Sequence, residues 1–145
     1  MNGLLQSTGV VLVCAGAALS GFAHAAATAF DGRWAVLLSC PDTRDKNGLV
    51  KGYEYHFTAT VQDGALEGKY GAPGHPSSVV YTGQVSAEGV LDIQATGNTG
   101  RSDYSVGKVA QGTQYTYTMR GKLEASRGQA TRSDLRPCTA SFSKL

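Results

Sequence analysis

The sequence predicts an all-β fold: an antiparallel up-and-down barrel of about seven to eight strands closed by one disulfide. A β-sandwich built from the same strands is the alternative. Three observations lead to this prediction. Helical periodicity is absent after residue 25, apolar and polar residues alternate with a period of two, and Gly or Asp-Gly interrupts these runs at short intervals. Short strands joined by short connections favour a meander, and closing it into a barrel removes the exposed edges.

The 145-residue chain begins with a segment, residues 1–25, that we expect to be a cleaved secretory signal. It contains an apolar stretch at 9–19, no Asp, Glu, Lys or Arg, and an Ala-His-Ala sequence ending at Ala25 that fits signal peptidase. A retained membrane anchor and a lipoprotein signal at Cys14 are the alternatives. We therefore expect one domain, residues 26–145, in the periplasm or outside the cell and without stable membrane insertion.

Each predicted strand is a short run in which apolar residues recur at every second position. In chain order these runs are 32–40, 53–63, 65–70, 79–86, 90–96, 104–109, 114–125 and 138–143. The clearest is 53–63, where Tyr, Phe, Ala and Val alternate with Glu, His, Thr and Gln. Such a pattern predicts one buried and one solvent-facing side.

The segments between these runs contain the residues that favour turns and loops. Asp63-Gly64 is a strong hairpin signal. We predict loops at 42–48, 71–76 and 97–103, and turns at 87–89 and 126–128.

Cys40 and Cys138 remain after signal cleavage, and an even pair in an oxidising compartment predicts a disulfide. In a closed barrel the first and last strands are antiparallel neighbours. The end of the first strand, at Cys40, then lies beside the start of the last, at Cys138. Reactive thiols are the alternative, but a second cysteine or a histidine close in sequence is missing.

Charge and motif content argue against several classes of function. The chain has 13 Lys and Arg against 11 Asp and Glu, a net charge of +2, which does not indicate a nucleic-acid partner. His56 and His75 lack metal-ligand spacing, and neither a nucleophile elbow nor a phosphate-binding loop is present. We therefore expect no catalytic residues, no metal and no cofactor, and a protein that is not an enzyme.

The predicted domain opens with Phe-Asp-Gly-Arg-Trp, ending at Trp34. This Gly-x-Trp element resembles that of the lipocalin, avidin and bacterial metalloprotease-inhibitor group of small exported barrels. The resemblance implies that Trp34 closes the barrel floor beneath a basic side chain from a late strand, with Arg136 or Arg120 as the cation. A core tryptophan in an unrelated fold is the alternative.

Four tyrosines lie at alternate positions in the two predicted strands with the clearest alternation, so that the two on each strand share a face. They are Tyr53, Tyr55, Tyr115 and Tyr117. If these positions face inward, their rings line a pocket for a small, partly polar ligand. A packed interior with hydroxyls at the rim is the alternative. We therefore expect an exported, non-enzymatic binding module whose partner is an unknown small molecule or protein. A secreted inhibitor of an enzyme such as a protease, or a structural envelope protein, is the alternative, and the oligomeric state is left open.

Overall fold

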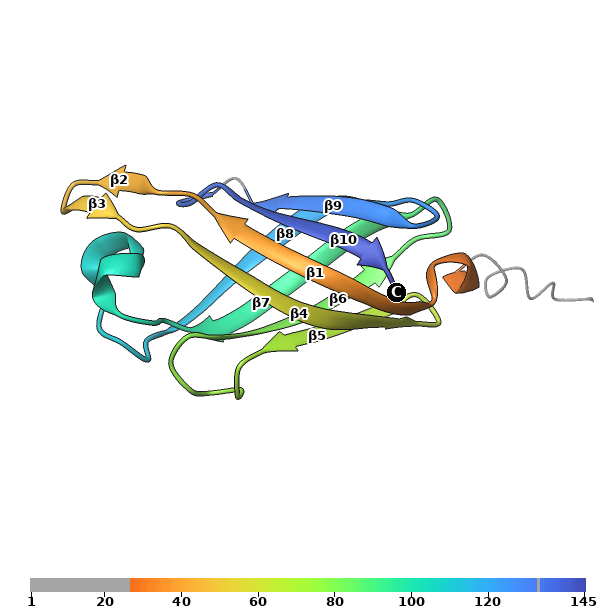
Figure 1. The fold of residues 1–145 in the computed structure, drawn as a ribbon, viewed down its shortest axis with the longest axis horizontal. Helices are drawn as coiled ribbons and strands as arrows, with labels where there is room; N and C mark the ends of the chain where they lie inside the picture. The colour runs from red at the N-terminus through yellow and green to blue at the C-terminus, as the bar shows by residue number, and fades with distance from the viewer. Residues whose placement is uncertain (1–26, 133) are drawn as a thin grey trace, which may run out of the picture.

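The computed structural model describes residues 27–132 and 134–145, and its main element is a closed antiparallel β-barrel (Figure 1). Eight strands follow one another around the barrel in the order β1-β10-β9-β8-β7-β6-β5-β4. Their bounds are β1 Gly32–Cys40, β4 Tyr53–Gln62, β5 Ala65–Tyr70, β6 Ser78–Val85, β7 Val90–Asn98, β8 Gln114–Leu123, β9 Arg127–Arg132 and β10 Cys138–Lys144. The predicted barrel is confirmed. The predicted signal, residues 1–25, lies outside the described residues.

Five short elements complete the described chain. β2 (Thr43–Asp45) and β3 (Gly48–Val50) form a separate two-stranded hairpin. The 3-10 turn η1 (Ala27–Phe30) precedes β1, and two further 3-10 turns, η2 (Ser102–Tyr104) and η3 (Val106–Lys108), lie between β7 and β8.

Two predicted segments were wrong, and one strand was not predicted. Residues 104–109 form part of η2 and η3 rather than a strand, and Gly107 adopts a left-handed φ of 76° that breaks extended geometry there. Strand β9 was missed, because among its six residues only Ala130 is buried and no apolar alternation exists to detect. The predicted loop 42–48 contains β2 and the start of β3.

The predicted disulfide is confirmed at the seam where the barrel closes. β1 and β10 pair antiparallel with Ser39 opposite Thr139, so the next position along each strand brings Cys40 to Cys138. These two cysteines are buried and bonded, with Cα atoms 4.3 Å apart. The last strand is therefore joined to the first by backbone pairing and by a covalent bond.

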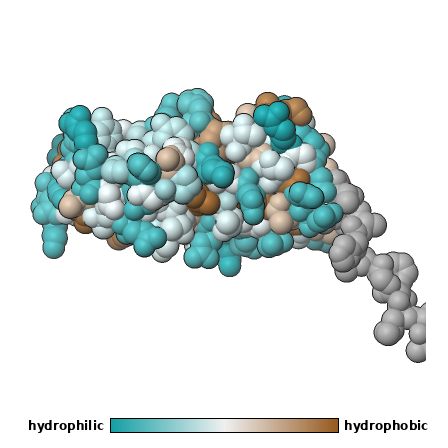
Figure 2. Space-filling view, turned by 90° about the horizontal axis from the view of Figure 1, so that it is seen from below, coloured by the Kyte–Doolittle hydropathy of each residue, from teal (hydrophilic) through white to brown (hydrophobic). Residues whose placement is uncertain are grey.

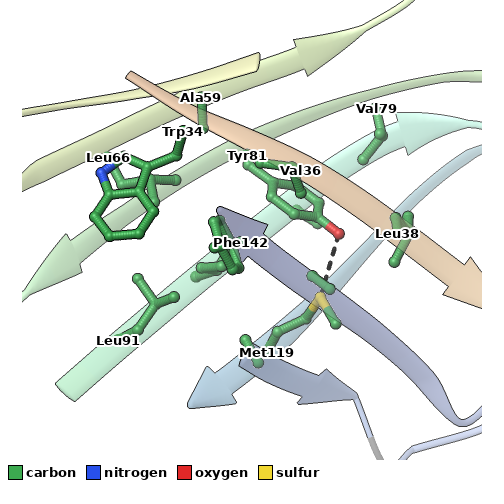
Figure 3. Close-up of a cluster of buried hydrophobic side chains, with 14 of the residues drawn as sticks. Trp34, Val36, Leu38, Ala59, Leu66, Val79, Tyr81, Leu91, Met119 and Phe142 are labelled. Atoms are coloured by element: carbon green, nitrogen blue, oxygen red, sulfur yellow. Dashed lines mark hydrogen bonds between the residues drawn. The ribbon is translucent and has the colours of Figure 1, made fainter. Parts of the chain in front are cut away.

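One half of the barrel interior is filled by large side chains, several of them shown in Figure 3. Trp34, Leu66, Leu91 and Phe142 are all fully buried there. Trp34 donates a hydrogen bond from Nε1 to the carbonyl oxygen of Phe30 in η1, at 3.0 Å, which holds the 3-10 turn over this end. We call this end of the barrel the floor.

The cation beside the tryptophan is Lys144, and neither Arg136 nor Arg120 occupies that place. The Nζ atom of Lys144 lies 5.6 Å from the ring centroid of Trp34, which it faces across the β1–β10 pairing. Arg120 is exposed on the outer surface and pairs with Asp92 at 2.8 Å. Arg136 lies in the loop before β10, whose first residues are at the opposite end of the barrel from Trp34.

The two ends of the barrel differ in the length of their connections. At the floor the strands are joined by residues 63–64, 86–89 and 124–126. At the other end, which we call the mouth, the connections are 41–52, 71–77, 99–113 and 133–137. Figure 1 shows the β2–β3 hairpin and the η2–η3 coil together at the mouth, with η1 and the C-terminus at the floor.

The outer wall follows the expected alternation, with exposed polar residues between the inward-facing ones. The face seen in Figure 2 is mostly hydrophilic, and its apolar patches are small and separate. Among the described residues, no helical segment combines the length and the apolar character needed to cross a bilayer.

Candidate functional site

A cavity of about 450 Å³ opens at the mouth of the barrel. This volume lies within the range of about 300–1,000 Å³ that is usual for small-molecule sites. Strand ends supply part of its lining, and three mouth loops supply the rest: 71–77, 99–113 and the described residues 134–137. The interior of the barrel is therefore packed toward the floor and hollow at the mouth.

Two walls of the cavity are aromatic and face each other across the barrel. Tyr53 and Tyr55 lie on β4, while Tyr115 lies on β8. Counting around the eight-stranded ring in either direction, β8 is four strands from β4, so the two strands are opposite each other. The cavity thus lies between tyrosine rings that come from opposite sides.

Ring stacking fixes the orientation of these walls. Tyr55 stacks on Tyr70 of β5, with centroids 4.0 Å apart and planes 10° from parallel. Tyr115 is nearly parallel to Tyr117, at 5.8 Å and 8°. Offset stacking of this kind restricts ring rotation, so the walls are ordered before any ligand enters.

Three of the four tyrosines proposed from sequence line the cavity, and the fourth lies beneath it. Tyr117 is only 5% exposed. Its hydroxyl lies 3.4 Å from that of Tyr81, which in turn donates to the sulfur of Met119 at 3.2 Å. Tyr117 therefore belongs to the packed layer that forms the bottom of the cavity. Figure 3 shows Tyr81 and Met119 in this layer.

Burial raises the pKa of three tyrosines that line the cavity. It raises the pKa of Tyr55 to about 12, and it also raises the pKa of Tyr53 and of Tyr115 above the ordinary value. At neutral pH these hydroxyls are uncharged. The aromatic walls therefore offer flat apolar faces and neutral hydroxyl groups.

Arg136 ties the mouth loops together. Its guanidinium donates to the carbonyl oxygens of Tyr104 at 2.8 Å and Pro41 at 3.1 Å, and also to that of Lys51. These carbonyls lie in two different loops, 41–52 and 99–113, and Arg136 itself belongs to a third. Its carbon Cζ also lies 4.9 Å from the ring centroid of Tyr53. The side chain is thus structural, at the mouth rather than over Trp34.

The guanidinium of Arg136 makes no ion pair with a described residue, although the carboxylate of Asp42 lies near enough to oppose in part the lowering of its pKa by burial. The residue is 3% exposed, and no described carboxylate lies within ion-pair distance of it. Its Nε is buried and has no hydrogen-bond partner among the described residues. Burial lowers the pKa of Arg136, but a guanidinium stays protonated at neutral pH.

Two more arginines line the cavity, and both are paired with acids at its rim. The guanidinium of Arg132 lies 4.1 Å from the ring centroid of Tyr117 and binds Asp134 through Nε and Nη2. Arg101 pairs with Asp103 at 3.0 Å. Neither aspartate lines the cavity, and no other Asp or Glu does so. The lining therefore contributes positive charge alone.

Several lining residues were not among the site residues predicted from sequence, for identifiable reasons. Tyr70 lies on the same face of β5 as the buried Leu66, so the alternation along this strand indicates that Tyr70 points inward. Tyr104 and Arg101 lie in a loop, where no periodicity shows which way a side chain points. Arg132 ends the strand that was not predicted.

The described residues contain no group of three His, Cys, Asp or Glu side chains that could hold a metal ion. His56 lies on the exposed face of β4, and His75 lies exposed in loop 71–77. A second hollow, of about 560 Å³, lies on the outer wall over β5 to β8. Exposed polar side chains such as Glu67, Thr82 and Gln94 line it, so it is part of the solvated surface.

Comparison with known proteins returns no relative for this chain: no family model, curated protein or solved structure matches it.

Proposed function

We propose that the protein is an exported, non-enzymatic binding module that holds a small molecule in the mouth cavity. The observation that carries the proposal is the 450 Å³ hollow lined by five tyrosines, in a barrel that is otherwise packed. A barrel that served only as a scaffold gains stability by filling this space, because dispersion contacts are lost around a void. The unfilled hollow at the mouth therefore favours a binding site that a ligand occupies over a simple scaffold.

The rigidity of the site supports the same proposal. Stacked rings fix two walls, and Arg136 fixes three loops through its carbonyl partners. A site that is ordered in advance loses less conformational entropy when a ligand binds. The disulfide beside the mouth adds to this order and fits a protein of an oxidising compartment. We place the protein in the periplasm or outside the cell, after removal of residues 1–25.

Native mass spectrometry tests the proposal on protein recovered from its own host's envelope or medium without reductant. The expected species starts at Ala26, is two hydrogens lighter than the reduced chain, and carries a reproducible small adduct. Val106→Trp places a large side chain at the cavity wall and is expected to remove the adduct. Thr82→Trp adds the same side chain to the outer wall and is expected to keep it. An adduct that survives in Val106→Trp, or a wild-type protein that never carries one, contradicts small-ligand binding at this site.

A further inference from the structure

We propose that the ligand is a small aromatic anion, a carboxylate on a flat ring system, whose ring lies between the β4 and β8 tyrosine walls and whose charge lies at Arg132. This inference rests on the proposed function, because it names the class of ligand that the same cavity takes. Shape, charge distribution and unused donors each contribute to it.

The shape of the cavity favours a flat ring. Tyr55 and Tyr115 belong to strands on opposite sides of the barrel, and each is held nearly parallel to a neighbouring tyrosine. A planar ligand placed between such walls contacts an aromatic face on each side. Aromatic pairs contribute about 0.5–1.5 kcal/mol beyond the burial of their area.

Two of the three arginines that line the cavity lie on one side of it, and the third, Arg101, belongs to loop 99–113 and is paired with Asp103. Arg132 ends β9, and Arg136 lies in the loop between β9 and β10. Around the ring, β5 lies opposite β9 and β6 lies opposite β10, so the loop that faces these arginines is 71–77. That loop contributes Ser77, a neutral hydroxyl, to the lining. A ligand with a negative group at one end matches this asymmetry.

Donors for an anion remain on the arginine side. Arg132 uses Nε and Nη2 to bind Asp134, and its Nη1 makes no hydrogen bond with any described residue. Asp134 is half-exposed at the rim, so a second oxyanion inside the cavity can share the guanidinium. The buried charge of Arg136 adds to the positive potential here, because it forms no ion pair with a described carboxylate and Asp42 offsets it only from a distance. Charge-assisted hydrogen bonds from arginine to a carboxylate are among the strong ones in proteins.

Aromatic walls alone would also suit a cation, and the charged residues decide between the two. Sites that bind ammonium ions use ring faces to attract positive charge. Here three arginines already lie over tyrosine rings: Arg132 over Tyr117, Arg136 over Tyr53 and Arg101 over Tyr104. A cationic ligand would meet like charges and no lining carboxylate. Tyr55 and Tyr115, whose pKa values burial raises, supply no negative charge either.

Isothermal titration calorimetry with three probes of one ring system tests the inference. Indole-3-acetate, indole-3-acetamide and tryptamine carry a negative, a neutral and a positive group on the same ring. We expect wild-type protein to bind the carboxylate roughly tenfold or more tightly than the amide, and tryptamine weakest. Arg132→Gln is expected to weaken carboxylate binding by roughly tenfold while leaving the amide unchanged. Arg120→Gln, on the outer face of neighbouring β8, serves as the matched control and is expected to change neither.

The outcomes separate this inference from the proposed function. Equal or tighter binding of the amide or of tryptamine overturns the inference that the ligand is an anion. It leaves the proposal of a small-ligand site in place. Retained carboxylate affinity in Arg132→Gln overturns the role of that residue. Binding of none of the three probes overturns the inference, and the adduct test on host-derived protein then decides separately whether the cavity holds another small molecule. Arg132→Lys keeps the charge and is expected to retain preference for the carboxylate, which distinguishes lost charge from a misfolded mouth.

Discussion

Replacing Cys40 and Cys138 together by alanine removes a crosslink between residues 98 positions apart. In the chain-entropy account, a closed loop of about 100 residues stabilises the folded state by about 4.7 kcal/mol at 25 °C, by restricting the unfolded chain. The folded barrel does not depend on the bond for closure, because β1 and β10 pair from Trp34 opposite Lys144 to Ser39 opposite Thr139. We therefore expect a native-like barrel whose free energy of unfolding is lower by about 4–5 kcal/mol.

Urea unfolding followed by circular dichroism measures this loss. Because the unfolded chain is released from a large loop, the urea m-value is expected to rise along with the fall in stability. Wild-type protein treated with reductant should behave like the double variant. The matched control is Ser39→Ala with Thr139→Ala, the adjacent pair in the same register, which is expected to have a much smaller effect.

A loss below about 1 kcal/mol would refute the entropic reasoning for this barrel. So would an unchanged m-value, since a chain released from a large loop should expose more surface on unfolding. A double variant without native near-ultraviolet circular dichroism would show that the β1–β10 pairing cannot close the barrel alone.

Three further predictions concern the packed part of the barrel. Lys144→Met removes the cation beside Trp34 and is expected to cost about 0.5–1 kcal/mol in urea unfolding, because the lysine is exposed. Gly121→Ala would drive a Cβ into the carbonyl oxygen of Gln129 on β9, and we expect a loss of roughly 1–3 kcal/mol in thermal unfolding. Burial raises the pKa of Tyr117 above its usual value. Its contribution to stability is therefore complete below about pH 10 and declines above it, by up to about 1.4 kcal/mol per pH unit. Tyr117→Phe is expected to flatten this alkaline decline, as measured by urea unfolding at about pH 8 and pH 11.

Each of these predictions has its own control. Arg120→Met on the outer face of β8 tests whether loss of any surface cation matters as much as loss of Lys144. Thr116→Ala, exposed on β8, tests whether any alanine on this strand weakens the barrel as Gly121→Ala does. For the alkaline series, tyrosinate absorbance of the buried rings should rise only as the barrel unfolds. Full ionisation while circular dichroism stays native contradicts the inferred burial.

The strands that could be found from sequence are those whose burial repeats strictly. In 53–62 and 114–123 the inward and outward positions differ in polarity along the whole run, so a local pattern reports the strand and its buried side. The disulfide followed from two cysteines and the neighbourhood of first and last strands. Strand β9 was not predictable, because its pairing with β8 and β10 holds a segment with one buried side chain.

The sequence by itself determined the strand alternation and predicted the covalent seam, because each depends on local polarity or on the pairing of two reactive groups. It predicted a barrel but left a β-sandwich open, and only the tertiary structure decided between them, since closure depends on which strands pair. Only the tertiary structure decided the depth of each inward side chain, and this is why Tyr117 lies under the cavity that Tyr115 lines. It also decided that Lys144, and not Arg136, meets Trp34, since strand register brings residues together that are more than a hundred positions apart. The alternation of a strand fixes which face a residue occupies, whereas the position of that residue along the barrel axis depends on how all eight strands are staggered.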